Sequence, residues 1–212
     1  MYKLYLPAVC IAIFASSFSM PAFSKRYPVD RYNKTKGNEQ TFYGVTQLKN
    51  QQYSTLNCFG PTILEQSQIL EQANIYGPLT ANKTTFKKLQ AFGPVKGDTI
   101  SFKQANIQGP ISLKQAKASG TLTVLGPLQA QDSRFMDIFI ACHELTLDNC
   151  FVNNLSVKQA STDDQTQQVL RLKGNTTIHG KISFESGNGI IELHDPDVKI
   201  HTIEGATLKR AY

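Results

Sequence analysis

A Gly-Pro pair recurs five times along the chain, and successive pairs stand 16 or 17 residues apart. The pairs are Gly60-Pro61, Gly77-Pro78, Gly93-Pro94, Gly109-Pro110 and Gly126-Pro127. A fixed period indicates a repeat architecture in which each repeat stacks on its neighbours. Paired helices are excluded as the repeating unit, because a proline in every repeat, together with Gly, Asn and Thr, interrupts any helix of useful length.

Apolar residues alternate with polar ones inside each repeat. The second position after each glycine holds Thr62, Leu79, Val95, Ile111 and Leu128. The ninth position holds Ile69, Phe86, Phe102, Ala118 and Phe135. This alternation predicts strands with one buried face. Three short strands and three corners fit one repeat, with coils stacked about 4.8 Å apart. We expect the ninth column, extended by Tyr53, to be core packing and not an aromatic platform for a ligand.

The same frame extends beyond the Gly-Pro pairs. Gly44 stands 16 residues before Gly60, and His143-Glu144 takes the place of the next pair, which gives about seven regular coils in residues 42–159. Residues 160–170 break the frame and predict a surface loop. Alternating segments resume at 169–172, 177–184, 190–193 and 198–203. The predicted fold class is all-β: a single-domain parallel β-helix, or solenoid, in which residues 160–212 form a loop and two or three less regular coils that act as an irregular C-terminal cap.

The N-terminus has the composition of an export signal. Residues 1–24 contain Lys3, a following apolar run, and the small residues Ala22 and Ser24 at the −3 and −1 positions of a cleavage site after Ser24. An uncleaved anchor is the alternative, although the run is short for a membrane span and contains Pro7. Residues 25–41 are polar and basic and predict a flexible leader. We therefore expect an exported protein, periplasmic, at the cell surface or secreted, without a transmembrane segment after cleavage.

Three cysteines remain after residue 24. Cys58 falls in an inward column beside Ile75 and reads as a buried small hydrophobe. Cys142 and Cys150 stand eight residues apart. This spacing is compatible with a disulfide between them and also with two free thiols. His143 adjoins Cys142, but the chain has no paired Cys-x-x-Cys spacing, so we expect no metal site and no cofactor.

Positive charge gathers in the middle of the chain. Residues 77–125 hold one acid, Asp98, and seven lysines: Lys83, Lys87, Lys88, Lys96, Lys103, Lys114 and Lys117. Residues 126–212 hold eight basic and eleven acidic side chains. This asymmetry suits head-to-tail self-association or a polyanion-binding face; the alternative is a solvated lysine face that keeps the solenoid soluble. Since no outward aromatic residue is expected among the lysine-rich coils, nucleic acid is not an expected partner.

The chain carries no motif of a known catalytic class. It lacks a G-x-S-x-G elbow, a P-loop, an H-E-x-x-H pair and an EF-hand loop. A β-helix enzyme acting on polysaccharides needs rows of exposed acids, and the regular coils supply almost none. We therefore expect a protein that is not an enzyme.

Two phrases of the repeat resemble those of a known family. Phe92-Gly-Pro-Val-Lys-Gly-Asp-Thr-Ile100 and Ile107-Gln-Gly-Pro-Ile111 are similar to the coils of bactofilins, the bacterial polymer-forming cytoskeletal proteins. The resemblance covers residues 42–159 and implies a compact right-handed β-helix that assembles end to end without a nucleotide. Bactofilins are cytoplasmic, whereas this chain carries an export signal, so fold analogy does not transfer their function.

These observations favour a non-enzymatic role. The leading hypothesis is an exported structural or adhesive solenoid of the bacterial cell envelope that self-assembles end to end, since uncovered solenoid ends expose unpaired strand edges. The second is a module that binds a polyanion, such as an acidic glycan or lipopolysaccharide, through the seven lysines. A polysaccharide-active enzyme is the third.

Overall fold

In the computed structural model, which describes residues 39–159 and 167–212, the chain is a parallel β-solenoid of about ten turns, without a helix in these ranges. The predicted signal peptide, and the leader as far as residue 38, lie outside the described residues. So does most of the predicted surface loop. The solenoid prediction is confirmed.

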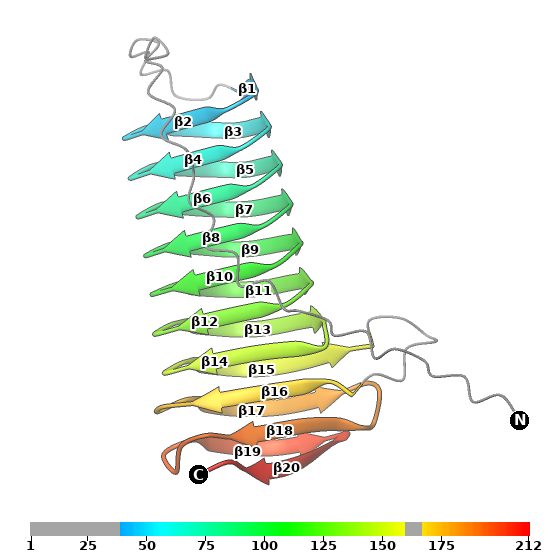
Figure 1. The fold of residues 1–212 in the computed structure, drawn as a ribbon. Coiled ribbons are helices and arrows are strands. Elements are labelled where there is room, and N and C mark those ends of the chain that lie inside the picture. The colour runs from blue at the N-terminus through cyan, green and yellow to red at the C-terminus, as the bar shows by residue number, and fades with distance from the viewer. Residues whose placement is uncertain (1–38, 160–166) are drawn as a thin grey trace, which may run out of the picture. The chain divides into compact units, whose positions relative to one another are not determined.

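Each turn contributes one strand to each of two ten-stranded parallel sheets (Figure 1). The long sheet consists of β1 (Glu39–Tyr43), β3 (Gln52–Phe59), β5 (Gln68–Tyr76), β7 (Thr85–Phe92), β9 (Ser101–Gln108), β11 (Lys117–Leu125), β13 (Arg134–Ala141), β15 (Phe151–Lys158), β17 (Thr177–Phe184) and β19 (Lys199–Glu204). The short sheet consists of β2 (Thr46–Lys49), β4 (Thr62–Glu65), β6 (Leu79–Asn82), β8 (Val95–Asp98), β10 (Ile111–Lys114), β12 (Leu128–Gln131), β14 (Glu144–Asp148), β16 (Val169–Lys173), β18 (Gly189–Leu193) and β20 (Ala206–Arg210). Within each sheet the strands lie in chain order, and the odd-numbered strands form one sheet and the even-numbered strands the other.

The long strands bend in the middle, which accounts for the third predicted corner. In β7 the consecutive residues Lys87 and Lys88 are both exposed, between inward Phe86 and Leu89. The pairing register shifts at the equivalent place between β5 and β7. The chain therefore has two hydrogen-bonded strands per coil instead of three, and each long strand has an N-terminal half and a C-terminal half that face different directions.

Inward side chains stack in columns and form one continuous core. Ile69, Phe86 and Phe102 are buried, as expected for core packing, and Tyr53 packs against them partly buried. Cys58 is buried and pairs in register with Ile75, as predicted. These columns hold the two sheets together by burying apolar surface along the whole axis.

The Gly-Pro pairs form the corner between a long strand and the next short one. The five glycines have φ between +136° and +145°, a region that residues with a Cβ avoid. A Cβ on Gly77 would also lie 2.7 Å from the carbonyl oxygen of Gly60 in the preceding coil. Glycine is therefore required by the backbone angle and by the close stacking of successive corners.

The corner after each of the first seven short strands is closed by a left-handed residue, and from β4 to β14 a buried side chain follows it. Asn50, Gln66, Lys83, Thr99, Gln115, Asp132 and Asn149 all have φ near +50°. Hydroxyl or thiol groups often follow and bond to backbone: Ser133 Oγ donates to the Gln131 carbonyl at 2.7 Å and accepts from the Ala116 amide at 2.9 Å. Buried polar backbone groups at this corner are thus satisfied from one coil to the next.

The C-terminal segment continues both sheets, so the solenoid has about ten turns and not the predicted seven regular coils with less regular coils as a cap. β17 pairs in register with β15, Ile178 beside Val152 and Ile182 beside Leu155. This coil is longer than the others. Beside the extra residues lies buried Gln168, whose Nε2 donates to the carbonyls of Cys142 at 3.0 Å and Lys158 at 2.7 Å. The frame breaks at the insertion, but the inward residues remain apolar beyond it.

Candidate binding surface

Four aromatic rings stack on the outside of the first coils, each at the end of a long strand. We call Tyr43, Phe59, Tyr76 and Phe92 the aromatic ladder. Successive ring centroids are 5.2, 4.8 and 5.0 Å apart, and the ring planes are within 12° of parallel. Tyr43 is 79% exposed, Phe59 41% and Tyr76 44%. The ladder is therefore a continuous apolar stripe on the surface and not part of the core.

The rings of the ladder are stacked with a lateral offset. Atoms of parallel rings in contact approach to about 3.5–4.0 Å, so centroids 4.8–5.2 Å apart mean that each ring is offset from the next. Offset stacking is the favoured arrangement of aromatic pairs. Each ring therefore leaves part of its face uncovered, available to a flat apolar surface of a ligand.

Side-chain amides run parallel to the ladder; on β3, β5 and β7 each stands two residues before a ring, and the column continues onto β9. We call Asn57, Asn74, Gln90 and Asn106 the amide column, since the register pairs each with the next. Asn74 Nδ2 donates to Asn57 Oδ1 at 2.7 Å, and Gln72 Nε2 donates to Asn74 Oδ1 at 2.7 Å. Among the described residues, the side chains of Gln90 and Asn106 have no such partner, so they present both donors and acceptors to solvent.

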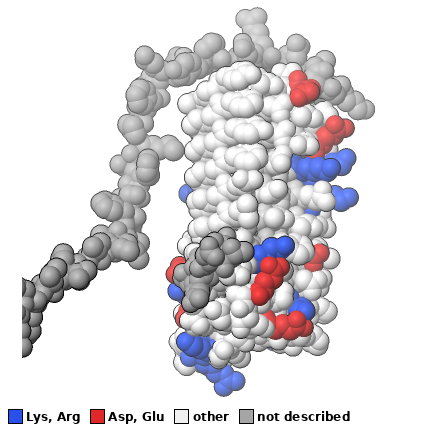
Figure 2. All heavy atoms as spheres, turned by 90° about the vertical axis from the view of Figure 1, so that its right-hand side faces the viewer, with Lys and Arg blue, Asp and Glu red and all other residues white. Residues whose placement is uncertain are grey.

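A shallow depression lies beside the free amides. It has a volume of about 410 Å³ and is bordered by Gln90 and Asn106, and on the bend side by Lys88 and Gln104. No Asp, Glu, Lys or Arg belongs to the aromatic ladder or the amide column. Figure 2 shows this edge of the molecule, with a broad uncharged surface over the first coils and charged side chains at its margin and on the last coils. The surface thus combines flat apolar rings with uncharged hydrogen-bonding groups.

The seven predicted lysines do not share one face. Lys96 and Lys114 point outward from the short sheet, and Lys83 stands at the left-handed corner. Lys117 begins β11. The remaining three, Lys87, Lys88 and Lys103, lie on the bends of β7 and β9. The structure therefore brings together only part of the group as a basic cluster.

The three described cysteines are buried and free. Cys150 occupies the small-residue position of a corner, and its Sγ donates to the carbonyls of Asp148 at 3.2 Å and Ala130 at 3.4 Å. Cys142 lies at the other corner of the same short strand. A disulfide between Cys142 and Cys150, one of two alternatives from the sequence, is therefore not formed in this structure. Burial raises the pKa of the Cys142 thiol to about 12 and that of Cys150 to about 11, since a buried thiolate is poorly solvated.

The described residues hold neither a metal-binding cluster nor a membrane-spanning helix. His, Cys, Asp and Glu side chains in residues 39–159 and 167–212 nowhere gather in a group able to hold a metal ion. The same ranges contain no helix long and apolar enough to cross a membrane.

Comparisons with protein-family models, with curated proteins and with solved structures gave no match. The similarity to bactofilins over residues 42–159 therefore stays a resemblance between motifs, and the function has to be argued from the surface itself.

The aromatic ladder was missed at the sequence level. We expected no outward aromatic among the lysine-rich coils, and Phe92 contradicts this, since it is the last, outward residue of β7. The signal was present: Phe59, Tyr76 and Phe92 each directly precede a Gly-Pro pair, out of phase with the inward residues. The inward columns follow the apolar alternation, whereas these outward rings do not.

Proposed function

We propose that this chain is an exported, non-enzymatic adhesive module of the bacterial cell envelope that binds an extended, uncharged polysaccharide on the C-terminal halves of its first long strands. One observation carries the proposal: stacked, partly exposed rings run beside a column of side-chain amides, and none of these ring or amide side chains is charged. A sugar ring has apolar C–H faces that pack on aromatic rings and hydroxyl groups that pair with amides.

The geometry favours a polymer over a small molecule. The rungs repeat at the inter-strand spacing along a straight axis, a distance close to the length of one pyranose unit. The depression beside the column is open and shallow, unlike the enclosed pockets that bury most of a small ligand. A linear glycan lying along the solenoid axis would place successive sugars on successive rungs.

The proposal is tested by binding to insoluble and soluble polysaccharides. We expect the purified protein to sediment with cellulose, chitin or curdlan, which are uncharged, and the variant Phe59→Ala/Tyr76→Ala to lose at least about tenfold in affinity. Removing two stacking contacts of about 1 kcal/mol each accounts for that loss. The matched control is Tyr212→Ala, which removes an exposed tyrosine outside the ladder. Binding to none of the three, or equal loss in both variants, would contradict the proposal.

A second candidate, end-to-end assembly, is favoured by the last coil. Leu208 in β20 pairs with fully buried Ile191 but is itself 43% exposed. Ile200 and Ile203 continue buried columns and are only partly covered. Among the described residues, β19 and β20 pair on one side only. A second copy could continue both sheets, because strand edges and inward apolar columns are open together.

Assembly is tested separately from glycan binding. Light scattering and negative-stain microscopy across salt should show particles whose length grows with protein concentration. Leu208→Lys should abolish that growth, whereas Leu125→Lys, at a comparably exposed leucine on the side of the solenoid, should not. A strict monomer at every concentration would eliminate this candidate and leave the aromatic surface as the functional one.

A further inference from the structure

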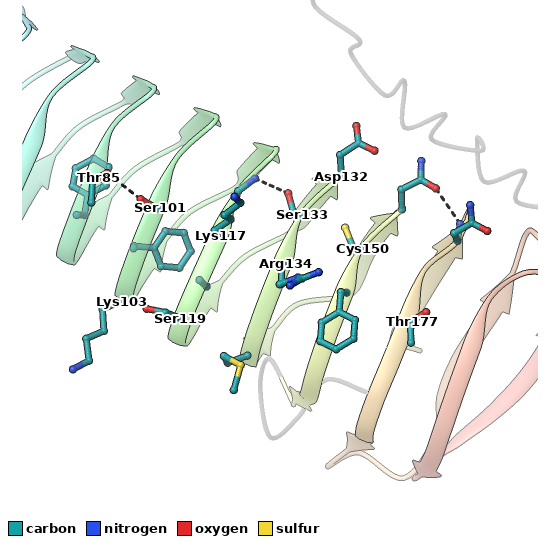
Figure 3. Close-up of a pocket in the computed structure, with 18 residues that line it drawn as sticks. Thr85, Ser101, Lys103, Lys117, Ser119, Asp132, Ser133, Arg134, Cys150 and Thr177 are labelled. Carbon is teal, nitrogen blue, oxygen red and sulfur yellow. Dashed lines mark hydrogen bonds between the residues drawn. The ribbon is translucent and has the colours of Figure 1, made fainter.

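A second depression lies on the N-terminal halves of the long strands, across the bend from the aromatic ladder. Its volume is about 1020 Å³, and it spans β7 to β17. Figure 3 shows Lys103, Lys117 and Arg134 on three successive strands, with the Lys103 side chain directed away from the other two. Ser119 lies between the first and last of these strands. This surface is separate from the one that carries the proposed function.

This second depression, called the hollow below, arises because a short side chain lies between two long ones. Ala118 pairs in register with Phe102 on one side and Phe135 on the other. The next residue, Ser119, therefore lies between Lys103 and Met136, the residues that follow those two phenylalanines. A hydroxymethyl group beside two long side chains leaves open space above the sheet.

The charge around the hollow is unbalanced. Lys117 and Arg134 stand directly opposite each other on β11 and β13, an arrangement that is destabilising for like charges. No carboxylate of the described residues lies within ion-pair distance of either side chain or of Lys103. Asp132 stands at the rim, so the border carries three cations and one anion.

Arg134 is held in place without an acidic partner. Its guanidinium carbon lies 5.3 Å from the centroid of the Phe151 ring, within the range of a cation–π contact. Equivalent positions in other coils are mostly uncharged, such as Thr85, Ser101 and Thr177. Two adjacent cations, one of them fixed over a ring, form a preorganised pair of donors for an oxyanion.

We propose that Lys103, Lys117 and Arg134 form a second binding site, for the carboxylate or sulfate groups of an acidic polysaccharide. An oxyanion seated above Ser119 would bridge the two opposed cations and relieve their repulsion. A repeating polyanion places further charges within reach of Lys87, which precedes Lys103 by one coil on the bends. The seven lysines predicted from the sequence thus reduce to a smaller site that includes an arginine the sequence did not single out.

The test compares two charge-matched double variants. The probes are dextran sulfate and polygalacturonate, with unmodified dextran as the uncharged reference. The wild-type protein should bind both polyanions, more weakly at higher salt. Lys117→Gln/Arg134→Gln should lose about tenfold in affinity, while Lys96→Gln/Lys114→Gln, which removes the same charge from the short sheet, should stay within about twofold of the wild type.

A third variant separates shape from charge. Ser119→Phe fills the hollow without altering the net charge and should also weaken binding, and its thermal midpoint shows whether the fold is intact. Equal losses in the two charge variants would mean attraction by net charge alone and would overturn the site. Duplex DNA bound as tightly as polygalacturonate would overturn the acidic-polysaccharide assignment. Since none of these changes touches the aromatic ladder, their outcome is independent of the proposed function.

Discussion

The first and last coils share the same two-sheet architecture but differ in the side chains on their surfaces. In β14 to β20, charged side chains pair with each other: Arg171 with Glu144 at 3.3 Å and with Glu192 at 3.1 Å, and Lys181 with Glu204. In β1 to β9 the recorded pair is Lys49 with Glu65. The long-sheet surface of these first coils instead carries exposed rings and amides.

This difference between the first and last coils indicates which surface is free to bind a ligand. Several charged side chains of the last coils are paired within the chain, so these groups offer less to a ligand. The first coils leave an apolar stripe uncovered, and contiguous exposed apolar surface is a mark of interaction sites. The corners follow a similar division, since five successive corners from Gly60 to Pro127 use Gly-Pro pairs and the last coils use none.

The largest expected effect comes from a corner glycine. Gly77→Ala forces a Cβ into the Gly60 carbonyl at a φ of +145° and should lower the free energy of unfolding by about 3 kcal/mol or more. Gly187→Ala is the control: its φ is +71°, but a Cβ there meets nothing within 4 Å, so about 1 kcal/mol is expected. Urea denaturation of both variants measures this, and equal effects would show that the stacking of corners is not limiting.

The buried thiols predict a loss of stability at high pH. Burial raises the pKa of Cys142 to about 12 and of Cys150 to about 11, from 9.0. Their contribution is complete below pH 9 and is lost as pH rises towards the folded values, at about 1.4 kcal/mol per pH unit for each thiol. Between pH 8 and pH 10, Cys142→Ala/Cys150→Ser should therefore lose less stability than the wild type. Parallel pH profiles would contradict this.

A smaller effect is expected in the ion-paired last coils. Arg171→Gln removes both pairs with Glu144 and Glu192, partly exposed to solvent, and should lower stability by about 1 kcal/mol at low salt. The effect should shrink in high salt, because screening weakens such pairs. A loss independent of salt, measured by thermal unfolding, would assign the role of Arg171 to packing.

The smallest predicted change is a gain. Thr99 has φ +54°, an unfavourable value for a β-branched residue. Asn tolerates this conformation and already occupies the column at Asn50 and Asn149. Thr99→Asn should raise stability by about 0.5 kcal/mol, measured as the denaturation midpoint. A decrease would mean that the Thr99 hydrogen bonds to Asp98 and Gln115 outweigh the backbone strain.

The sequence predicted the solenoid because its corner chemistry is local. Gly-Pro pairs and the alternation around them mark each coil without knowledge of distant contacts. The left-handed corner was not predicted, because residues as different as Lys83 and Asp132 adopt it. The bend lies inside one continuous long strand, and the residues on both sides of it pair with the neighbouring strand. Composition alone therefore does not distinguish this bend from a third corner between separate strands.

The surface was harder to predict than the core. The lysines were grouped by sequence distance, whereas the coils distribute them over several faces. Arg134 was not considered, since it meets Lys117 only after a full turn. Columns of outward residues become visible once the register is fixed, which is why the aromatic ladder and the amide column emerged only from the structure.

The most direct test of the account is amide NMR of the labelled protein titrated with cellohexaose, chitohexaose and laminarihexaose. We predict that at least one of them shifts the signals of the C-terminal halves of β3, β5, β7 and β9, around Tyr76, Phe92 and Asn106, and leaves those of β16 to β20 unchanged. Shifts confined to the last coils, or no shift with any of the three, would contradict the assignment of the aromatic ladder as a polysaccharide-binding surface.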